Sequence, residues 1–248
     1  MEPTNAALYG KCVFTTIAIR DGKPFLWKKH WRRLSANAET LAIDLKCATE
    51  SLVLEALGES IEQNQVTNGR ARVTFFDERP SLIWGGESSS STTLTIITDG
   101  FREVPNNFKL TVSPYPVNSR SPLVGVKSCN YLENLMTVEE AKIRGFHEAL
   151  RVNERGEVTS TAMANVFWLK SGELFTPSLA TGCLAGTTRE FVLENFDCCE
   201  IETGIEELHS ADAIYLTSAG LGIVAVAEFD DRKLPNPPHQ ITELLTPN

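Results

Sequence analysis

The chain has 248 residues, of which 42% are hydrophobic and 22% are charged, a composition typical of one large globular domain or two modest ones. Its 32 acidic and 23 basic side chains give a formal net charge of −9, which argues against a general nucleic-acid binder and against adhesion to an anionic membrane. No apolar run approaches the roughly 20 residues that cross a bilayer.

The first half of the chain predicts strands interrupted by two helices. Residues 12–20 are rich in β-branched and aromatic side chains, and Asp21-Gly22 then indicates a turn into a return strand over 23–27. Apolar residues at helical spacing predict helices over 28–45 and 49–63. Further strand-like runs cover 70–76, 82–84, 92–98 and 108–112, with a polar loop, GGESSSS, over 85–91.

The second half begins after a proline-rich stretch, SPYPVNSRSP. This stretch predicts a domain boundary, with an N-terminal domain over 1–115, a linker over 116–122 and a larger C-terminal domain over 123–248. The expected elements there are a helix over 132–144, strands over 148–153 and 157–170, a helix opening near Gly186, and a last pair of strands over 213–229. Strands in runs with a few helices predict an α+β protein of two sheet-based halves.

Cysteine and histidine positions give no metal signal. The six cysteines match no zinc-binding spacing, and the four histidines are scattered, so we expect no metal centre. The N-terminal residues do not show the basic and apolar segments of a secretory signal. We therefore expect reduced thiols and a cytoplasmic protein.

One lysine stands out in the stretch LVGVKSCNYLEN, where Lys127 ends a run that reads as a buried strand. A surface lysine whose stem lies on apolar neighbours is the common explanation for such a residue. A lysine in a partly desolvated cleft instead has a lowered pKa, and its neutral amine can form a Schiff base.

Two other stretches could bind an anion. In LAGTTREFVL, a glycine followed by Thr187 and Thr188 precedes a helix, whose N-terminus suits a phosphate; a plain threonine N-cap explains the pattern equally well. In HWRRL, which begins at His30, one arginine could face inward to an anion, or both could belong to a solvated basic helix face.

The order and spacing of several motifs resemble the class IV aminotransferases, which are pyridoxal-phosphate enzymes of fold type IV. The motifs are YGKCVFTTI, KHWRRL, GVKSCNYLEN, GEVTSTAMANVFWLKSGELFTP, LAGTTR and DAIYLTSAGLGIVAV. The resemblance implies a small α/β-sandwich N-terminal domain and a larger pseudo-barrel C-terminal domain. It also implies pyridoxal 5′-phosphate as cofactor, a small-molecule substrate and a homodimer.

The resemblance assigns roles to individual residues. Lys127 matches the lysine that forms the Schiff base, and Arg33 matches the arginine that pairs with the cofactor's phosphate. Thr187 and Thr188 match the loop that holds this phosphate from its other side. Asn165 matches the asparagine beside the cofactor.

Within the family, the chain most resembles the aminodeoxychorismate lyases. It is short for an aminotransferase, and the interval from Lys127 to Asn130-Tyr131 has the compact form found in lyases and D-amino-acid aminotransferases. Phe14-Thr15-Thr16 resembles a lyase motif whose second threonine, here Thr16, lies near the reacting centre. Two β-branched residues in a strand are the ordinary alternative.

Three departures from the family pattern bear on the reaction. Ser160 replaces the glutamate that bonds the cofactor's pyridine nitrogen, and Glu157 is not expected to substitute, because on a strand it points to the opposite face. Lys11-Cys12 stands where Asp-Gly is common, and Ser218-Ala219 where lyases carry Asn-Ala or Asn-Ser. We expect Ser218 and Tyr131 to lie near the substrate.

The resemblance therefore implies a lyase that converts 4-amino-4-deoxychorismate to 4-aminobenzoate and pyruvate, with Lys127 moving the proton at the amine-bearing carbon and Thr16 assisting. A D-amino-acid or branched-chain aminotransferase is one alternative. A degenerate homologue that binds the cofactor, or nothing, without catalysis is another.

Overall fold

The computed structural model describes residues 4–80 and 91–245, and the chain divides into two compact units. Unit 1 comprises Met1–Arg102 and Val126–Tyr131, and unit 2 comprises Glu103–Gly125 and Leu132–Asn248. This division differs from the predicted one, because residues 116–122 lie inside unit 2 and the segment that carries Lys127 returns to unit 1. Proline content marks where a chain turns, but it does not show with which strand the chain pairs afterwards.

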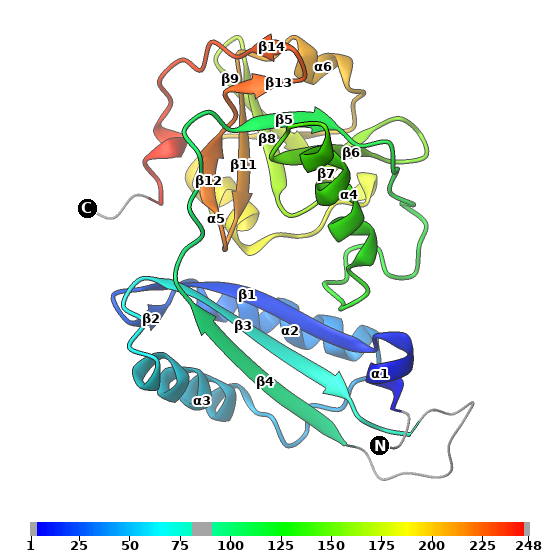
Figure 1. Ribbon diagram of the computed structural model, residues 1–248, viewed down its shortest axis with the longest axis vertical. Helices are drawn as coiled ribbons and strands as arrows, with labels where there is room; N and C mark the ends of the chain where they lie inside the picture. Colours follow the sequence, from blue (N-terminus) through cyan, green and yellow to red (C-terminus); the bar gives the residue numbers. More distant parts are fainter. Residues whose placement is uncertain (1–3, 81–90, 246–248) are drawn as a thin grey trace. The chain divides into compact units, whose positions relative to one another are not determined.

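Unit 1 is an antiparallel sheet with strand order β2-β1-β3-β4 and two long helices (Figure 1). Its strands are β1 (Cys12–Arg20), β2 (Lys23–Pro24), β3 (Gly69–Asp77) and β4 (Thr92–Asp99). Its helices are α1 (Asn5–Tyr9), α2 (Trp27–Thr40) and α3 (Glu50–Gln63). The long helices α2 and α3 share one apolar core with one face of the sheet.

Side-chain alternation along β1 places different residues on the two faces of this sheet. Val13, Ile17 and Ile19 are buried in the core beneath the helices. Because neighbouring side chains on a strand point to opposite faces, Phe14 and Thr16 lie on the other face. Phe14 and Thr16 therefore lie on the face of the sheet that the long helices do not cover.

Two expectations for unit 1 need correction. The return strand over 23–27 is only Lys23–Pro24, because Leu26 adopts a left-handed conformation with φ of 56° and α2 begins at the next residue. The helix expected over 28–45 ends at Thr40, because Ala42 is also left-handed and lets Ile43 turn back into the core. The expected strand over 82–84 and nearly all of the loop over 85–91 lie outside the described residues.

Unit 2 contains two five-stranded sheets, with orders β10-β9-β8-β11-β12 and β14-β13-β5-β6-β7. The strands of the first are β8 (Asn165–Lys170), β9 (Glu173–Pro177), β10 (Cys199–Ile201), β11 (Ala213–Ser218) and β12 (Gly222–Ala225). Those of the second are β5 (Lys109–Val112), β6 (Glu148–Val152), β7 (Val158–Thr161), β13 (Glu228–Phe229) and β14 (Arg232–Lys233). The helices are α4 (Leu132–Ile143), α5 (Thr187–Asn195) and α6 (Glu206–His209).

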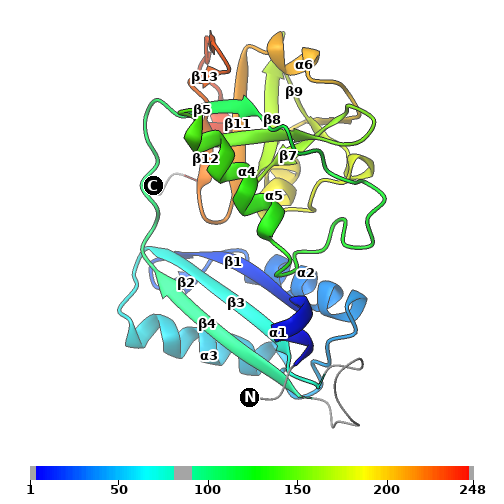
Figure 2. The same cartoon turned by 45° about the vertical axis from the view of Figure 1, so that its right-hand side comes forward.

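The helices of unit 2 pack on different sheets. Helix α4 packs on β6 and α5 packs on β11. Both helices are labelled in Figure 2. An apolar core that includes Leu150 of β6 and Trp168 of β8 joins the two sheets. None of the helices in the described part of the chain is long and apolar enough to cross a membrane.

The run over 157–170 is two strands and not one. β7 ends at Thr161 in one sheet, and β8 begins at Asn165 in the other. Thr161 and Ala164 close the turn between them, with the Ala164 amide donating to Thr161 Oγ1 at 3.0 Å. Both strands are buried on both faces, so the sequence carries no alternation that would reveal the break.

Candidate active site

Lys127 lies on the free edge of β1, in a segment without regular secondary structure. The expected buried strand is instead a turn at 122–125, in which Gly125 has φ of 74°, followed by a single bridge between Ser128 and Val13. The Phe14 amide donates to the Lys127 carbonyl at 3.0 Å. This pairing holds the lysine side chain on the open face of the unit 1 sheet.

Aromatic rings surround the amine of Lys127. Its Nζ donates to the Tyr131 hydroxyl at 3.2 Å and lies 4.4 Å from the centre of the Phe14 ring. Burial, followed by the charges of Arg33 and Arg72, lowers the pKa of Lys127 to about 7. The amine is therefore substantially neutral near physiological pH, as a nucleophilic lysine must be.

Arg33 is the inward-facing arginine of the HWRRL stretch. Its Nη2 donates to Thr15 Oγ1 at 3.0 Å, and the same hydroxyl lies 2.7 Å from Nδ1 of His30. His30 is only 1% exposed, and burial, with the charges of Arg33 and Lys127, lowers its pKa to about 3. A neutral histidine and a threonine thus orient Arg33, while Arg32 is exposed to solvent.

Arg72 is a third cation of this region, which the sequence did not single out. It lies opposite Thr16 in the register of β1 and β3, with its guanidinium 3.6 Å from the centre of the Phe14 ring. Arg33 and Arg72 both lower the pKa of Lys127, so three basic groups act on one region of unit 1. Such a region favours anionic ligands. Thr16, on the same face as Phe14, is half-buried there.

The second set of predicted cofactor residues belongs to unit 2, at the N-terminus of α5. Gly186 is the N-cap and no side chain caps the helix, while Thr187 and Thr188 are both buried. Asn165 Nδ2 donates to the Leu184 carbonyl at 2.8 Å, and a Cβ on Gly186 would collide with Asn165 Oδ1. The glycine therefore lets the loop and Asn165 approach closely and leaves backbone N–H groups for an anion.

Ser160, the residue in place of the usual glutamate, is half-buried on β7 and pairs with Arg151 of β6. The nearby glutamates have other partners. Glu157 accepts from Arg155 Nη2 at 2.6 Å, and the carboxylate of Glu148 accepts from the amide of Met163 at 3.1 Å. Burial raises the pKa of Glu148 to about 7. Glu148, which the sequence did not single out, thus fixes the turn that leads into Asn165.

Ser218, the last residue of β11, is half-buried, and its Oγ accepts from the Leu221 amide at 3.2 Å. Its neighbour Thr217 pairs with Asn165 across the sheet, and its Oγ1 is buried without a hydrogen-bond partner among the described residues. A buried hydroxyl in that state is suited to a polar ligand.

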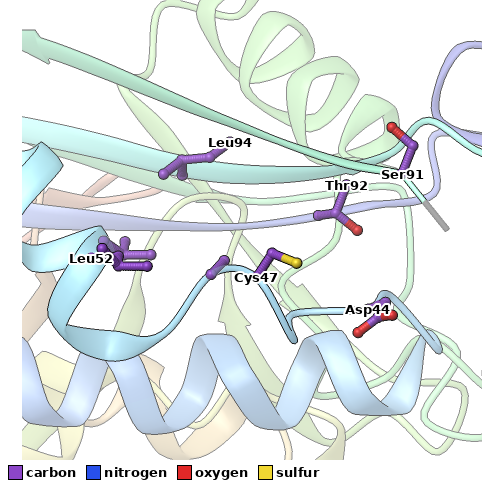
Figure 3. A pocket seen from close by; sticks show the side chains of 8 residues that line it. Asp44, Cys47, Leu52, Ser91, Thr92 and Leu94 are labelled. Carbon is purple, nitrogen blue, oxygen red and sulfur yellow. The ribbon is translucent and has the colours of Figure 1, made fainter.

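Unit 1 also has a cavity of about 350 Å³, which is separate from these residues. Figure 3 shows the side chains that line it. Its lining comprises Asp44, Cys47, Ala48, Leu52, Val53, Ser91, Thr92 and Leu94. Val53 and Leu94 pack with the core beneath α2 and α3. The cavity thus lies on the helical side of the sheet, opposite to the face that carries Phe14. Within the described residues, 4–80 and 91–245, no group of acidic, histidine or cysteine side chains is arranged to hold a metal ion.

The sequence matches the model of the family described as amino-transferase class IV over residues 12–229. The chain belongs to this family. It is 29% identical to the aminodeoxychorismate lyase of Bacillus subtilis over 233 residues, which cover 90% of this chain and 79% of the relative.

Solved structures of the family have the same fold. The branched-chain aminotransferase of Thermoproteus uzoniensis, with norvaline, has a TM-score of 0.88 and 25% identity, and the match covers 97% of this chain and 85% of the other. An aminotransferase of Brucella abortus bound to pyridoxal phosphate has a TM-score of 0.85 and 25% identity, with 97% and 89% covered. These matches confirm the α+β class, and the relatives include both lyases and aminotransferases.

The chain is therefore a pyridoxal-phosphate-dependent class IV enzyme, as the motifs predicted. The residues present fit this cofactor. Unit 1 offers a lysine whose amine is partly neutral, and unit 2 offers an uncapped helix N-terminus beside a buried, unpaired hydroxyl. These groups match an aldehyde and a phosphate respectively.

Proposed function

We propose that this enzyme converts 4-amino-4-deoxychorismate to 4-aminobenzoate and pyruvate. The observation that carries the proposal is Ser160 on β7, where the family has a glutamate, together with the engagement of Glu148 and Glu157 by other partners. A serine hydroxyl can donate a hydrogen bond to a neutral ring nitrogen, but it supplies no counter-charge for a protonated one.

This substitution suits an elimination better than a transamination. Pyridoxal phosphate supplies an aldehyde for the substrate's amine and a ring that withdraws electrons, and a neutral ring withdraws them less. Transamination needs the ring to stabilise the negative charge of the deprotonated substrate until a different carbon, on the cofactor, is protonated. In the lyase reaction, negative charge leaves with the enolpyruvyl group, and the product ring becomes aromatic, so the substrate itself contributes driving force.

Five residues divide the cofactor-binding and proton-transfer roles in this proposal. Lys127 holds the cofactor and, as neutral amine, removes the proton from the amine-bearing carbon of the substrate. Arg33 binds the phosphate, and Thr187 and Thr188 bind it through the N-terminus of α5. Asn165 orients this loop through its hydrogen bond to the Leu184 carbonyl.

Other residues face the substrate. Among the described residues, Arg72 forms no ion pair with a carboxylate, and its guanidinium stacks on Phe14. We therefore assign it to a carboxylate of the substrate, which carries two. Thr16 assists at the leaving group or the ring. Tyr131 and Ser218 complete the substrate contacts, with Tyr131 also holding the amine of Lys127.

A paired assay tests the reaction. Purified holoenzyme is given 4-amino-4-deoxychorismate, and pyruvate and 4-aminobenzoate are measured together; in parallel, D-alanine or L-leucine is offered with a keto acid. We expect the two products in equal amounts and turnover well above that of transamination. Brisk transamination with little pyruvate would contradict the lyase and favour the aminotransferase. Cofactor binding without either activity would identify a non-catalytic homologue.

Variants at position 160 sharpen this assay. Ser160→Glu restores the counter-charge for a protonated ring nitrogen, so we expect the ratio of transaminase to lyase turnover to rise. Ser160→Ala is the matched control, since it removes the hydroxyl without adding charge, and it should not raise that ratio. An unchanged ratio in Ser160→Glu would show that this residue does not decide between the reactions.

We also propose that the enzyme is a cytoplasmic homodimer. Helix α4 supports self-association, because four large apolar side chains on one of its faces are exposed: Leu132, Leu135, Met136 and Ile143. Large exposed apolar faces of this kind mark protein contacts. The six thiols, all free in the structure, are compatible with a reducing compartment.

A further inference from the structure

Two cysteines of unit 1 lie beside Lys127 on different segments. Cys12 is the first residue of β1, and Cys129 follows Lys127 by two positions. The Cys129 amide donates to the Cys12 carbonyl at 3.0 Å, next to the antiparallel bridge between Val13 and Ser128. This register places Cys12 opposite Cys129, with both side chains on the face that carries Phe14.

The register also brings the two sulfurs within reach of each other. Directly opposite residues of an antiparallel pair have Cα atoms about 4.5 to 5.5 Å apart, which is inside the range that a disulfide spans. The two side chains are close enough that each thiol shifts the pKa of the other. A bond between them would therefore need little movement of the backbone.

The surroundings make the two thiols unequal. The neighbouring thiol of Cys12, with help from the charges of Arg72 and Lys127, lowers the pKa of Cys129 to about 7, and Arg72 Nη2 lies 3.6 Å from its Sγ. The neighbouring thiol of Cys129, together with burial, raises the pKa of Cys12. Cys12 is 2% exposed, whereas Cys129 is partly exposed. The Cys129 sulfur is therefore the better nucleophile, while the Cys12 thiol stays protonated.

We propose that Cys12 and Cys129 form a peroxide-sensitive dithiol beside Lys127, in which Cys129 reacts first and Cys12 resolves the product. The Cys129 thiolate attacks one oxygen of a hydroperoxide, so that an S–O bond forms, the O–O bond breaks, and the other oxygen leaves and takes up a proton. Sulfur is oxidised by two electrons and the peroxide is reduced. The Cys12 sulfur then attacks Cys129, forming the S–S bond and releasing hydroxide, which takes the Cys12 proton as water.

Oxidation would change the groups around Lys127. The negative charge of Cys129 raises the pKa of Lys127, against the larger effects of burial and the arginines. A disulfide removes that charge and also removes the sulfur acceptor of Arg72. The dithiol is a feature of this chain, because Lys11-Cys12 stands where the resembled family commonly has Asp-Gly.

Peptide mapping of the holoenzyme tests the proposal. The protein is treated with one equivalent of hydrogen peroxide, its remaining thiols are blocked with N-ethylmaleimide, and it is digested with trypsin without reductant. Cleavage after Lys11 and Lys127 releases peptides 12–20 and 128–142, which carry one cysteine each. We expect these two peptides linked, with the loss of two hydrogen atoms, and their separation by dithiothreitol.

Single-cysteine variants assign the order of the steps. In Cys12→Ser, we expect Cys129 to stop at the sulfenic acid, which dimedone traps; in Cys129→Ser, we expect no oxidation at Cys12. Cys47→Ser, which removes an exposed thiol of the same unit, is the matched control and should leave the cross-link unchanged. Oxidation at Cys47 or Cys199 without the 12–129 link in the wild-type protein would overturn the proposal. Because the readout is covalent, its outcome is independent of the lyase reaction.

Discussion

Side chains from four segments determine the reactivity of Lys127. Phe14 comes from β1, Arg33 from α2, Arg72 from β3, and Tyr131 follows the lysine itself. The sequence singled out Lys127 from its local stretch, and Arg33 from the resemblance of its motifs to the family. It could not reveal Arg72, because an arginine in a strand acquires a role only when the register places it beside Phe14.

The first prediction concerns the pH dependence of cofactor capture by Lys127. Its pKa of about 7 lies below the ordinary value of 10.5, so the reactive neutral amine accumulates as pH rises through 7. We expect the rate at which cofactor-free protein captures pyridoxal phosphate to fall roughly tenfold per pH unit below this pKa and to level off above it. Stopped-flow absorbance measures this rate.

Arg72→Met provides the test of the cause. It removes a positive charge that lowers the pKa of Lys127, so the midpoint of the capture profile should move to higher pH. A midpoint that stays in place in Arg72→Met, or a wild-type midpoint near the ordinary lysine value, would refute the assigned environment.

The two threonines of β1 give a second prediction, since they face opposite sides of the sheet. Thr15→Val removes the acceptor of Arg33 Nη2 and should raise the Kd for pyridoxal phosphate by roughly tenfold, the cost of a hydrogen bond to a charged group. Thr16→Val is the matched control, which should lower turnover and leave the Kd nearly unchanged. Equilibrium titration of cofactor fluorescence measures both. Equal effects of the two variants on Kd would contradict the orientation.

At the scale of elements, the sequence predicted those whose side chains alternate or recur at helical spacing. The strand over Cys12–Arg20 and the helix over Glu50–Gln63 are confirmed almost to the residue. The break between β7 and β8 was missed, because residues buried on both faces look alike in either sheet. It depends on the distant carboxylate of Glu148, which accepts from the amide of Met163.

The loop before α5 gives the third prediction. A methyl group on Gly186 would meet Asn165 Oδ1, so Gly186→Ala should displace the loop and weaken cofactor affinity by at least about tenfold, a loss of roughly 1.4 kcal/mol. Gly58→Ala is the matched control: it lies within α3 with open space around it, and it should stabilise the protein by up to about 1 kcal/mol without changing affinity. Unchanged affinity in Gly186→Ala would show that the loop does not bind the phosphate.

At the scale of the whole molecule, the exposed apolar face of α4 predicts association of two chains. One chain has a mass of 27.4 kDa, so light scattering after gel filtration should give about 55 kDa. Leu135→Lys with Ile143→Lys places two charges on this face and should shift the protein toward the monomer. Leu52→Lys, on the exposed side of α3, is the control. A monomeric wild-type protein would contradict the homodimer. A double variant that remains dimeric would show that the dimer contact does not involve α4.

Reduction of the holoenzyme with borohydride, followed by peptide mapping, identifies the lysine to which the cofactor is attached. The reagent makes a carbon–nitrogen link between the cofactor's aldehyde and a lysine permanent, and trypsin no longer cleaves after the modified residue. We predict a single adduct on Lys127, in a peptide that runs uncleaved from Ser121 to Lys142. Cleavage after Lys127 with the adduct on a different lysine, or the absence of any adduct in a protein that retains its bound cofactor, would contradict the account.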